Sequence, residues 1–179
     1  MDANSAYKRS EALAYTHAIR DAGATVSEDP STLKPDAQFT ELQSGAGIPI
    51  LVDRTCTSAL DAASYLDKGA QALSTKAGRI GFSEAREIST LAAARSARVA
   101  LGLYAESALG TLISLQYGAA IPPALRLVAA EQTFYLGIRE QVITAMPPVR
   151  DGRIELPSDP DIAKLIDWES VKRFALARP

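Results

Sequence analysis

Short apolar runs recur along this chain about every 25 residues, and a polar residue follows each run directly. In the clearest case, the apolar run at residues 48–52 is followed by Asp53, a pattern typical of a buried parallel strand. The interval is 26 residues from Asp2 to Glu28, 25 from Glu28 to Asp53 and 23 from Asp53 to Lys76. One strand and one helix fit in such an interval, so the sequence predicts an α/β fold with a parallel sheet.

Helical patterns occupy the intervals between these runs. Ser10 and Ser83 can cap two of the helices, and Thr57 or Ser58 can cap a third. We expect helices at residues 10–22, 36–44, 57–68, 83–92 and 107–118, and strands at residues 24–27, 48–52, 70–75, 99–104 and 125–130. The pattern is interrupted at residues 146–148, after which we expect a strand near residues 153–156 and a final helix capped by Asp167.

Polar residues at the strand ends should come together in space. Parallel strands joined by right-handed crossovers place all their carboxyl ends at one face of the sheet. In (β/α) barrels that face carries the active site. We therefore expect convergence of the residues that follow the strands, with Glu131 after the last of them: Asp2, Glu28, Asp53, Lys76 and Glu131.

Three carboxylates on adjacent strand ends repel one another unless something neutralises them. A hard divalent cation such as Mg²⁺ does this with oxygen ligands and keeps positions open for substrate oxygens. Lys76, on the next strand, can then act as a general acid and base near the metal. A metal-free lyase that forms a Schiff base at Lys76 is the alternative, but it gives the three acids no task.

Composition excludes several other classes of protein. The chain is 47% hydrophobic and 22% charged, which is typical of a globular protein. Its net charge is −2, from 19 basic and 21 acidic residues without a basic run, so we expect no nucleic-acid partner. No run reaches the roughly 20 apolar residues of a membrane span, so we expect no membrane partner. Cys56 is the single cysteine, which favours a reducing, cytoplasmic location.

Seven segments match, in order, the motifs of one known family. They are Met1-Asp2-Ala3-Asn4, Ser27-Glu28-Asp29-Pro30, Ile48-Pro49-Ile50-Leu51-Val52-Asp53, Ser74-Thr75-Lys76, Glu106-Ser107-Ala108-Leu109-Gly110, Ala130-Glu131-Gln132-Thr133-Phe134 and Arg150-Asp151-Gly152-Arg153-Ile154. Through these segments the chain resembles the muconate cycloisomerase (muconate-lactonising) subgroup of the enolase superfamily, to which mandelate racemase-like barrels also belong. The resemblance covers nearly the whole chain.

The resemblance implies a role for each residue of the site. Asp2, Glu28 and Asp53 are the implied ligands of Mg²⁺ or Mn²⁺, Lys76 is the implied general acid/base, Glu131 faces the substrate and Asn4 supports the metal site. The implied substrate is a small carboxylate, whose α-proton moves while the metal stabilises the enolate. Members of the superfamily then act as cycloisomerases, racemases or epimerases, or dehydratases.

The chain departs from the family pattern in three ways. It contains no Lys-x-Lys strand and no N-terminal capping domain, so we expect a partial TIM barrel. That barrel would comprise about six strand–helix units, the third to the eighth, at residues 1–145, with residues 146–179 as an extension packing on it. Arg54 stands where the family usually has an acid. It can lower the pKa of Lys76, pair with a ligand carboxylate or weaken metal binding.

A non-catalytic reading also follows from the incomplete barrel. Six units do not close an eight-stranded barrel, so the outer strands would expose edges and apolar faces. Such a chain would be a truncated fragment of an enzyme that needs its missing N-terminal part or forms a homo-oligomer.

Overall fold

The computed structural model describes residues 1–146 and 148–175. Residue 147, which belongs to the expected interruption at residues 146–148, lies outside the described residues. Among the described helices, none is both long and apolar enough to cross a membrane.

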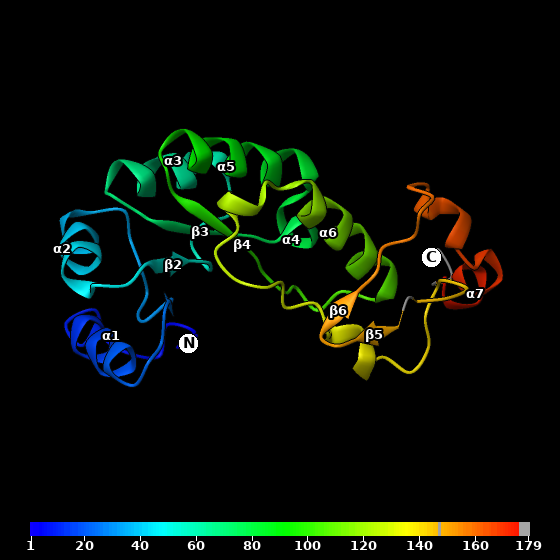
Figure 1. Cartoon of the computed structure of the whole chain (residues 1–179), viewed down its shortest axis with the longest axis horizontal. Helices are drawn as coiled ribbons and strands as arrows, with labels where there is room; N and C mark the ends of the chain where they lie inside the picture. Colours follow the sequence, from blue (N-terminus) through cyan, green and yellow to red (C-terminus); the bar gives the residue numbers. More distant parts are fainter. Residues whose placement is uncertain (147, 176–179) are drawn as a thin grey trace.

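Four parallel strands form the main sheet, and their order in the sheet is their order in the chain. They are β1 (Ser27–Glu28), β2 (Ile50–Val52), β3 (Ala72–Thr75) and β4 (Arg98–Leu101). Beyond β1, Asp2 forms a single parallel bridge to Glu28, and beyond β4, Arg126 forms one to Val99. The predicted α/β fold with a parallel sheet is confirmed, and the described sheet is open rather than closed into a barrel (Figure 1).

Helices connect the strands and bury one face of the sheet (Figure 1). They are α1 (Ala12–Asp21), α2 (Ala37–Ala46), α3 (Ala59–Asp67), α4 (Ala77–Ile80), α5 (Phe82–Ala94) and α6 (Ala108–Ala120). Phe39 of α2, Tyr65 of α3 and Ile88 of α5 share one apolar core with Leu73 of β3. Helices α2, α3 and α5 pack their buried apolar residues on this core, and the charged residues of the candidate site lie at the carboxyl ends of the strands.

Capping explains where several helices begin. The side chains of Asp36, Ser58 and Ser107 accept hydrogen bonds from backbone N–H groups at the starts of α2, α3 and α6. The prediction that Ser10 caps the first helix is wrong, because a turn at residues 8–11 delays the start of α1 to Ala12.

Two further sequence predictions are corrected by the structure. Ser83 lies inside α5 rather than capping it, because Gly81 (φ 84°) changes the chain direction between α4 and α5. No strand forms over residues 125–130 beyond the bridge at Arg126. Two consecutive prolines lead into a 3₁₀ turn at Pro123–Leu125, and no further strand follows to pair with this segment among the described residues.

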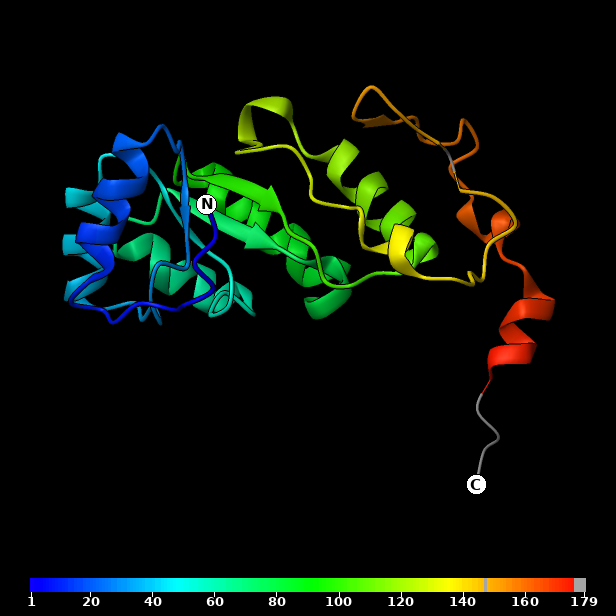
Figure 2. The ribbon, with the colours of Figure 1, turned by 90° about the horizontal axis from the view of Figure 1, so that it is seen from below.

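The C-terminal segment packs against α6 and then extends away from the sheet (Figure 2). It contains 3₁₀ turns at Phe134–Gly137 and Ile162–Leu165, the antiparallel pair β5 (Val149–Arg150) and β6 (Arg153–Ile154), and α7 (Trp168–Phe174). Leu112 of α6 shares a small apolar cluster with Tyr135, Ile143 and Ile162. Asp167 caps α7 as predicted, whereas the domain boundary at residue 145 stays a prediction.

Candidate functional site

A cavity of about 230 Å³ lies at the carboxyl ends of the strands. Asp2, Glu28, Lys76 and Glu131, four of the five residues expected to converge, line it together with Asn4. Glu28 ends β1 and Lys76 directly follows β3, whereas Asp2 bridges to Glu28 beside β1 and Glu131 follows the segment that bridges to β4 at Arg126. The parallel sheet therefore brings side chains that are up to 129 positions apart in the sequence around a single cavity.

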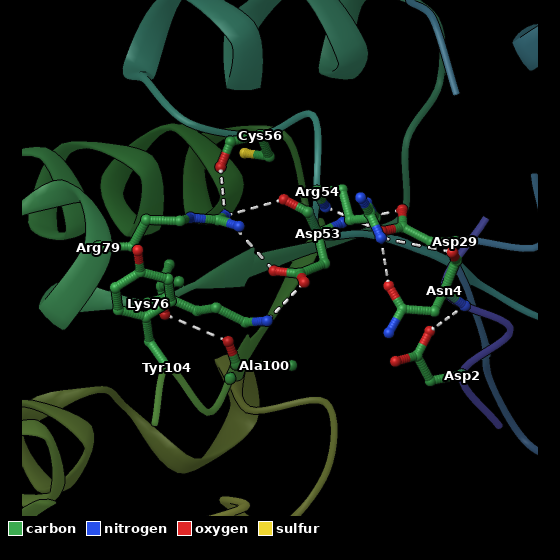
Figure 3. Close-up of polar contacts among 12 residues, drawn as sticks. Asp2, Asn4, Asp29, Asp53, Arg54, Cys56, Lys76, Arg79, Ala100 and Tyr104 are labelled. Atoms are coloured by element: carbon green, nitrogen blue, oxygen red, sulfur yellow. Dashed lines mark hydrogen bonds and ion pairs between the residues drawn. The ribbon is translucent and has the colours of Figure 1, made fainter. Parts of the chain in front are cut away.

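Asp53, the fifth of these residues, forms an ion-paired cluster beside the cavity (Figure 3). Lys76 Nζ donates to Asp53 Oδ2 at 2.5 Å, and Arg79 Nη2 lies 3.4 Å from Asp53 Oδ1. Arg79 also donates to the backbone carbonyl groups of Asp53 and Cys56, at 2.9 Å and 3.2 Å. Two cations thus hold a carboxylate whose side chain is only 8% exposed, which offsets much of the cost of burying it.

Asp29 fixes the backbone that carries Asp53. The residue is 2% exposed, and its two carboxylate oxygens accept hydrogen bonds from the backbone N–H groups of Asp53 (3.2 Å) and Arg54 (2.8 Å). Burial raises the pKa of Asp29 to about 6, although these two hydrogen bonds favour its charged form. Asp29 thereby ties the end of β1 to the loop after β2.

Glu28 carries the most perturbed carboxyl group of the cavity. Burial, followed by the negative charges of Asp2 and Asp53, raises its pKa to about 8, while the charge of Lys76 acts in the opposite direction. The side chain therefore holds its proton at neutral pH unless positive charge is added nearby. An excess of acidic oxygen atoms at one place is the electrostatic setting that favours a bound cation.

Asn4 and Arg54 form a polar link at the rim of the site (Figure 3). Arg54 Nη1 donates to Asn4 Oδ1 at 2.5 Å, and the backbone N–H of Asn4 donates to Asp2 Oδ1 at 2.7 Å. In the part of the chain that the structure describes, the Arg54 side chain donates its hydrogen bonds to Asn4. It does not pair with the carboxylate of a candidate metal ligand.

The candidate metal ligands do not form a closed set in this structure. Within residues 1–146 and 148–175, no three His, Cys, Asp or Glu side chains are grouped so that they could hold a metal ion. The two carboxylate oxygens of Asp53 are directed at Lys76 and Arg79. The oxygen donors of Asp2, Glu28 and Asp53 nevertheless have the chemistry that Mg²⁺ or Mn²⁺ requires.

Sequence reasoning missed three residues around the site. Asp29 directly follows the strand residue Glu28, so its position was the available signal. Arg79 lies in the segment at residues 78–81, and its part in the site depends on the long-range ion pair with Asp53, which the local sequence does not reveal. Ser74 lines the cavity two residues before Lys76, and its buried hydroxyl has no hydrogen-bond partner among the described residues.

Comparison with known proteins identifies the family. The model of the enolase C-terminal domain-like family matches residues 1–168. The chain belongs to this family. A curated relative in the enolase superfamily, the o-succinylbenzoate synthase of Geobacillus kaustophilus, is 29% identical over 175 residues, which are 97% of this chain and 46% of the relative.

Solved structures of the family have the same fold. The muconate lactonizing enzyme of Pseudomonas putida superposes with a TM-score of 0.86 at 23% identity, over 98% of this chain and 49% of that one. The 2-chloromuconate cycloisomerase of Rhodococcus opacus gives a TM-score of 0.86 at 26% identity, over 98% and 47%. The relatives of this enolase-type chain are thus enzymes, and the chain spans about half of their length. The suspected resemblance to muconate cycloisomerases is confirmed at the level of the family.

Proposed function

We propose that this chain provides the metal-binding and proton-transfer groups of a divalent-metal-dependent isomerase that acts on a small carboxylate, as muconate cycloisomerases do. The observation that carries the proposal is the cavity shared by Asp2, Glu28, Lys76 and Glu131, with Asp53 bonded to Lys76 at its side. Membership of the enolase C-terminal domain-like family supports the same assignment.

In this proposal Asp2, Glu28 and Asp53 hold Mg²⁺ or Mn²⁺. When bound, the metal supplies positive charge that stabilises negative charge on the oxygens of the substrate. Lys76, whose side chain reaches the cavity, takes the proton from the carbon next to the substrate carboxylate and returns one to the product. Glu131 faces the substrate across the cavity, and Asn4 orients Asp2.

A dehydratase-type reaction on the same class of substrate is the second candidate. It is favoured by one comparison, because the curated relative at 29% identity is an o-succinylbenzoate synthase rather than a cycloisomerase. Both candidates need the same metal and the same lysine, so the metal is the feature to test first.

Thermal melts in Mg²⁺, in Mn²⁺ and in a chelator test the metal requirement. At a metal concentration about 100 times Kd, binding adds about 2.7 kcal/mol to the free energy of unfolding, which gives a clear rise in Tm. We expect Asp53→Ala to abolish this rise. The matched control is Asp67→Ala, which removes an exposed acid paired with Arg95 and should leave the response intact. A wild-type Tm that is the same with and without divalent ions would contradict the proposed function.

A further inference from the structure

Gly102, the residue that follows β4, lies in contact with the side chain of Lys76. An ideal Cβ atom added at Gly102 would lie 2.5 Å from Lys76 Cε and 3.0 Å from Lys76 Cγ. It would also lie 2.6 Å from Ser74 Oγ. Carbon atoms in van der Waals contact are about 3.5–4.0 Å apart, so no side chain fits here while Lys76 keeps its position.

The glycine is required for space rather than for backbone conformation. Gly102 is not among the glycines with positive φ, so an L-residue could adopt its backbone geometry without strain. Gly102 also lines the cavity, together with Ser74 and Lys76. The aliphatic part of the Lys76 side chain therefore occupies the space that a side chain at residue 102 would fill.

Two hydrogen bonds prevent the backbone at Gly102 from moving away. Its N–H donates to the carbonyl oxygen of Thr75 at 3.2 Å, and its carbonyl oxygen accepts from Gln132 Nε2 at 3.1 Å. Gln132 is 3% exposed, so this second anchor is itself held by packing. When a methyl group is added, the flexible end of Lys76 has to move rather than the backbone.

We propose that Gly102 is a positioning residue for Lys76: by leaving room for the lysine stem, it directs Nζ to Asp53 and into the cavity. This inference rests on the proposed function for the importance of Lys76, but not for the contact itself. Any residue larger than glycine at this position would turn the lysine away from Asp53, and so would misplace the proton-transfer group.

Chemical labelling of lysines tests the proposal without substrate or metal. Limiting acetic anhydride followed by mass spectrometry gives the reactivity of Lys76 relative to the exposed Lys68. In the wild type the Lys76 side chain is 15% exposed and bonded to Asp53, so we expect slow labelling. In Gly102→Ala we expect a several-fold faster relative rate. Gly137→Ala is the matched control, because an added Cβ there meets nothing within 4 Å, and it should leave the rate unchanged.

A thermodynamic cycle covers the case in which Gly102→Ala folds poorly. In a Lys76→Ala background the two lysine carbons that block the new methyl group are gone and only Ser74 Oγ stays close to it, so Gly102→Ala should lower Tm less than it does in the wild type. Equal losses of Tm in the two backgrounds would overturn the proposal, as would an unchanged labelling rate in a folded Gly102→Ala. Faster labelling of Lys76 in Gly102→Ala, combined with a wild-type Tm that does not respond to divalent metal, would support the role of Gly102 and contradict the proposed function.

Discussion

The raised pKa of Glu28 makes the stability of the protein depend on pH. Burial is the main cause, and the charges of Asp2 and Asp53 add to it, so the pKa rises from 4.5 to about 8. In the folded protein this carboxyl group keeps its proton up to about pH 8, whereas in the unfolded chain it loses the proton near pH 4.5. The folded state therefore binds more protons between these values, and the free energy of unfolding falls as pH rises.

The size of this effect follows from the difference between the two pKa values. Each tenfold change in an ionisation constant corresponds to about 1.4 kcal/mol, so the loss between pH 4.5 and pH 8 is at most about 5 kcal/mol. Glu28→Gln carries no ionisable group and keeps nearly the same shape. We expect the variant to be close to wild type near pH 4.5 and increasingly more stable than wild type towards pH 8.

Urea unfolding in a chelating buffer at several pH values measures this difference. Glu41→Gln, at an exposed position of α2, is the matched control. The quantity to compare is the stability of Glu28→Gln minus that of wild type at each pH. If this difference stays constant from pH 5 to pH 8, burial and the neighbouring acids do not hold the proton on Glu28, and the reasoning is refuted.

Two further predictions concern buried side chains. Cys56 is fully buried, and burial raises the pKa of its thiol to about 12. We therefore expect a disulfide-exchange reagent to react with it only after urea unfolds the chain. Fast reaction in native buffer would contradict this prediction. Phe39 is 1% exposed and packs edge-to-face on Tyr65, so Phe39→Ala should cost about 3–5 kcal/mol in urea unfolding. Phe82→Ala, at a side chain that is 44% exposed, should cost much less, and similar losses for the two variants would argue against the assigned core.

The sequence was sufficient to predict the alternation of strands and helices. Residues 48–52 are apolar throughout, and a strand that is buried on both faces needs this pattern, which β2 shows. The segment at residues 125–130 is apolar except for Arg126, and it forms only one bridge, from Arg126 to Val99. A strand requires a hydrogen-bonding neighbour as well as a suitable composition, and composition alone does not reveal the neighbour.

The site was predictable in position but not in its pairings. The spacing of Glu28, Asp53 and Lys76 predicts that they meet at one edge, and the structure places them there. It does not predict that Lys76 bonds to Asp53, because that depends on the space left by Gly102. Nor does it predict the contacts of Asp29. Its partners are backbone N–H groups, which do not depend on the type of residue that carries them.

The sheet order β1-β2-β3-β4 has a consequence for how the protein acquires its structure. Each strand pairs with the strands that precede and follow it in the chain, so no pairing has to wait for a distant segment to arrive. Structure can spread from one unit to the next, as it does in repeat proteins. Amide hydrogen exchange should therefore show protection that is highest at the central strands and decreases stepwise towards Asp2 on one side and Arg126 on the other.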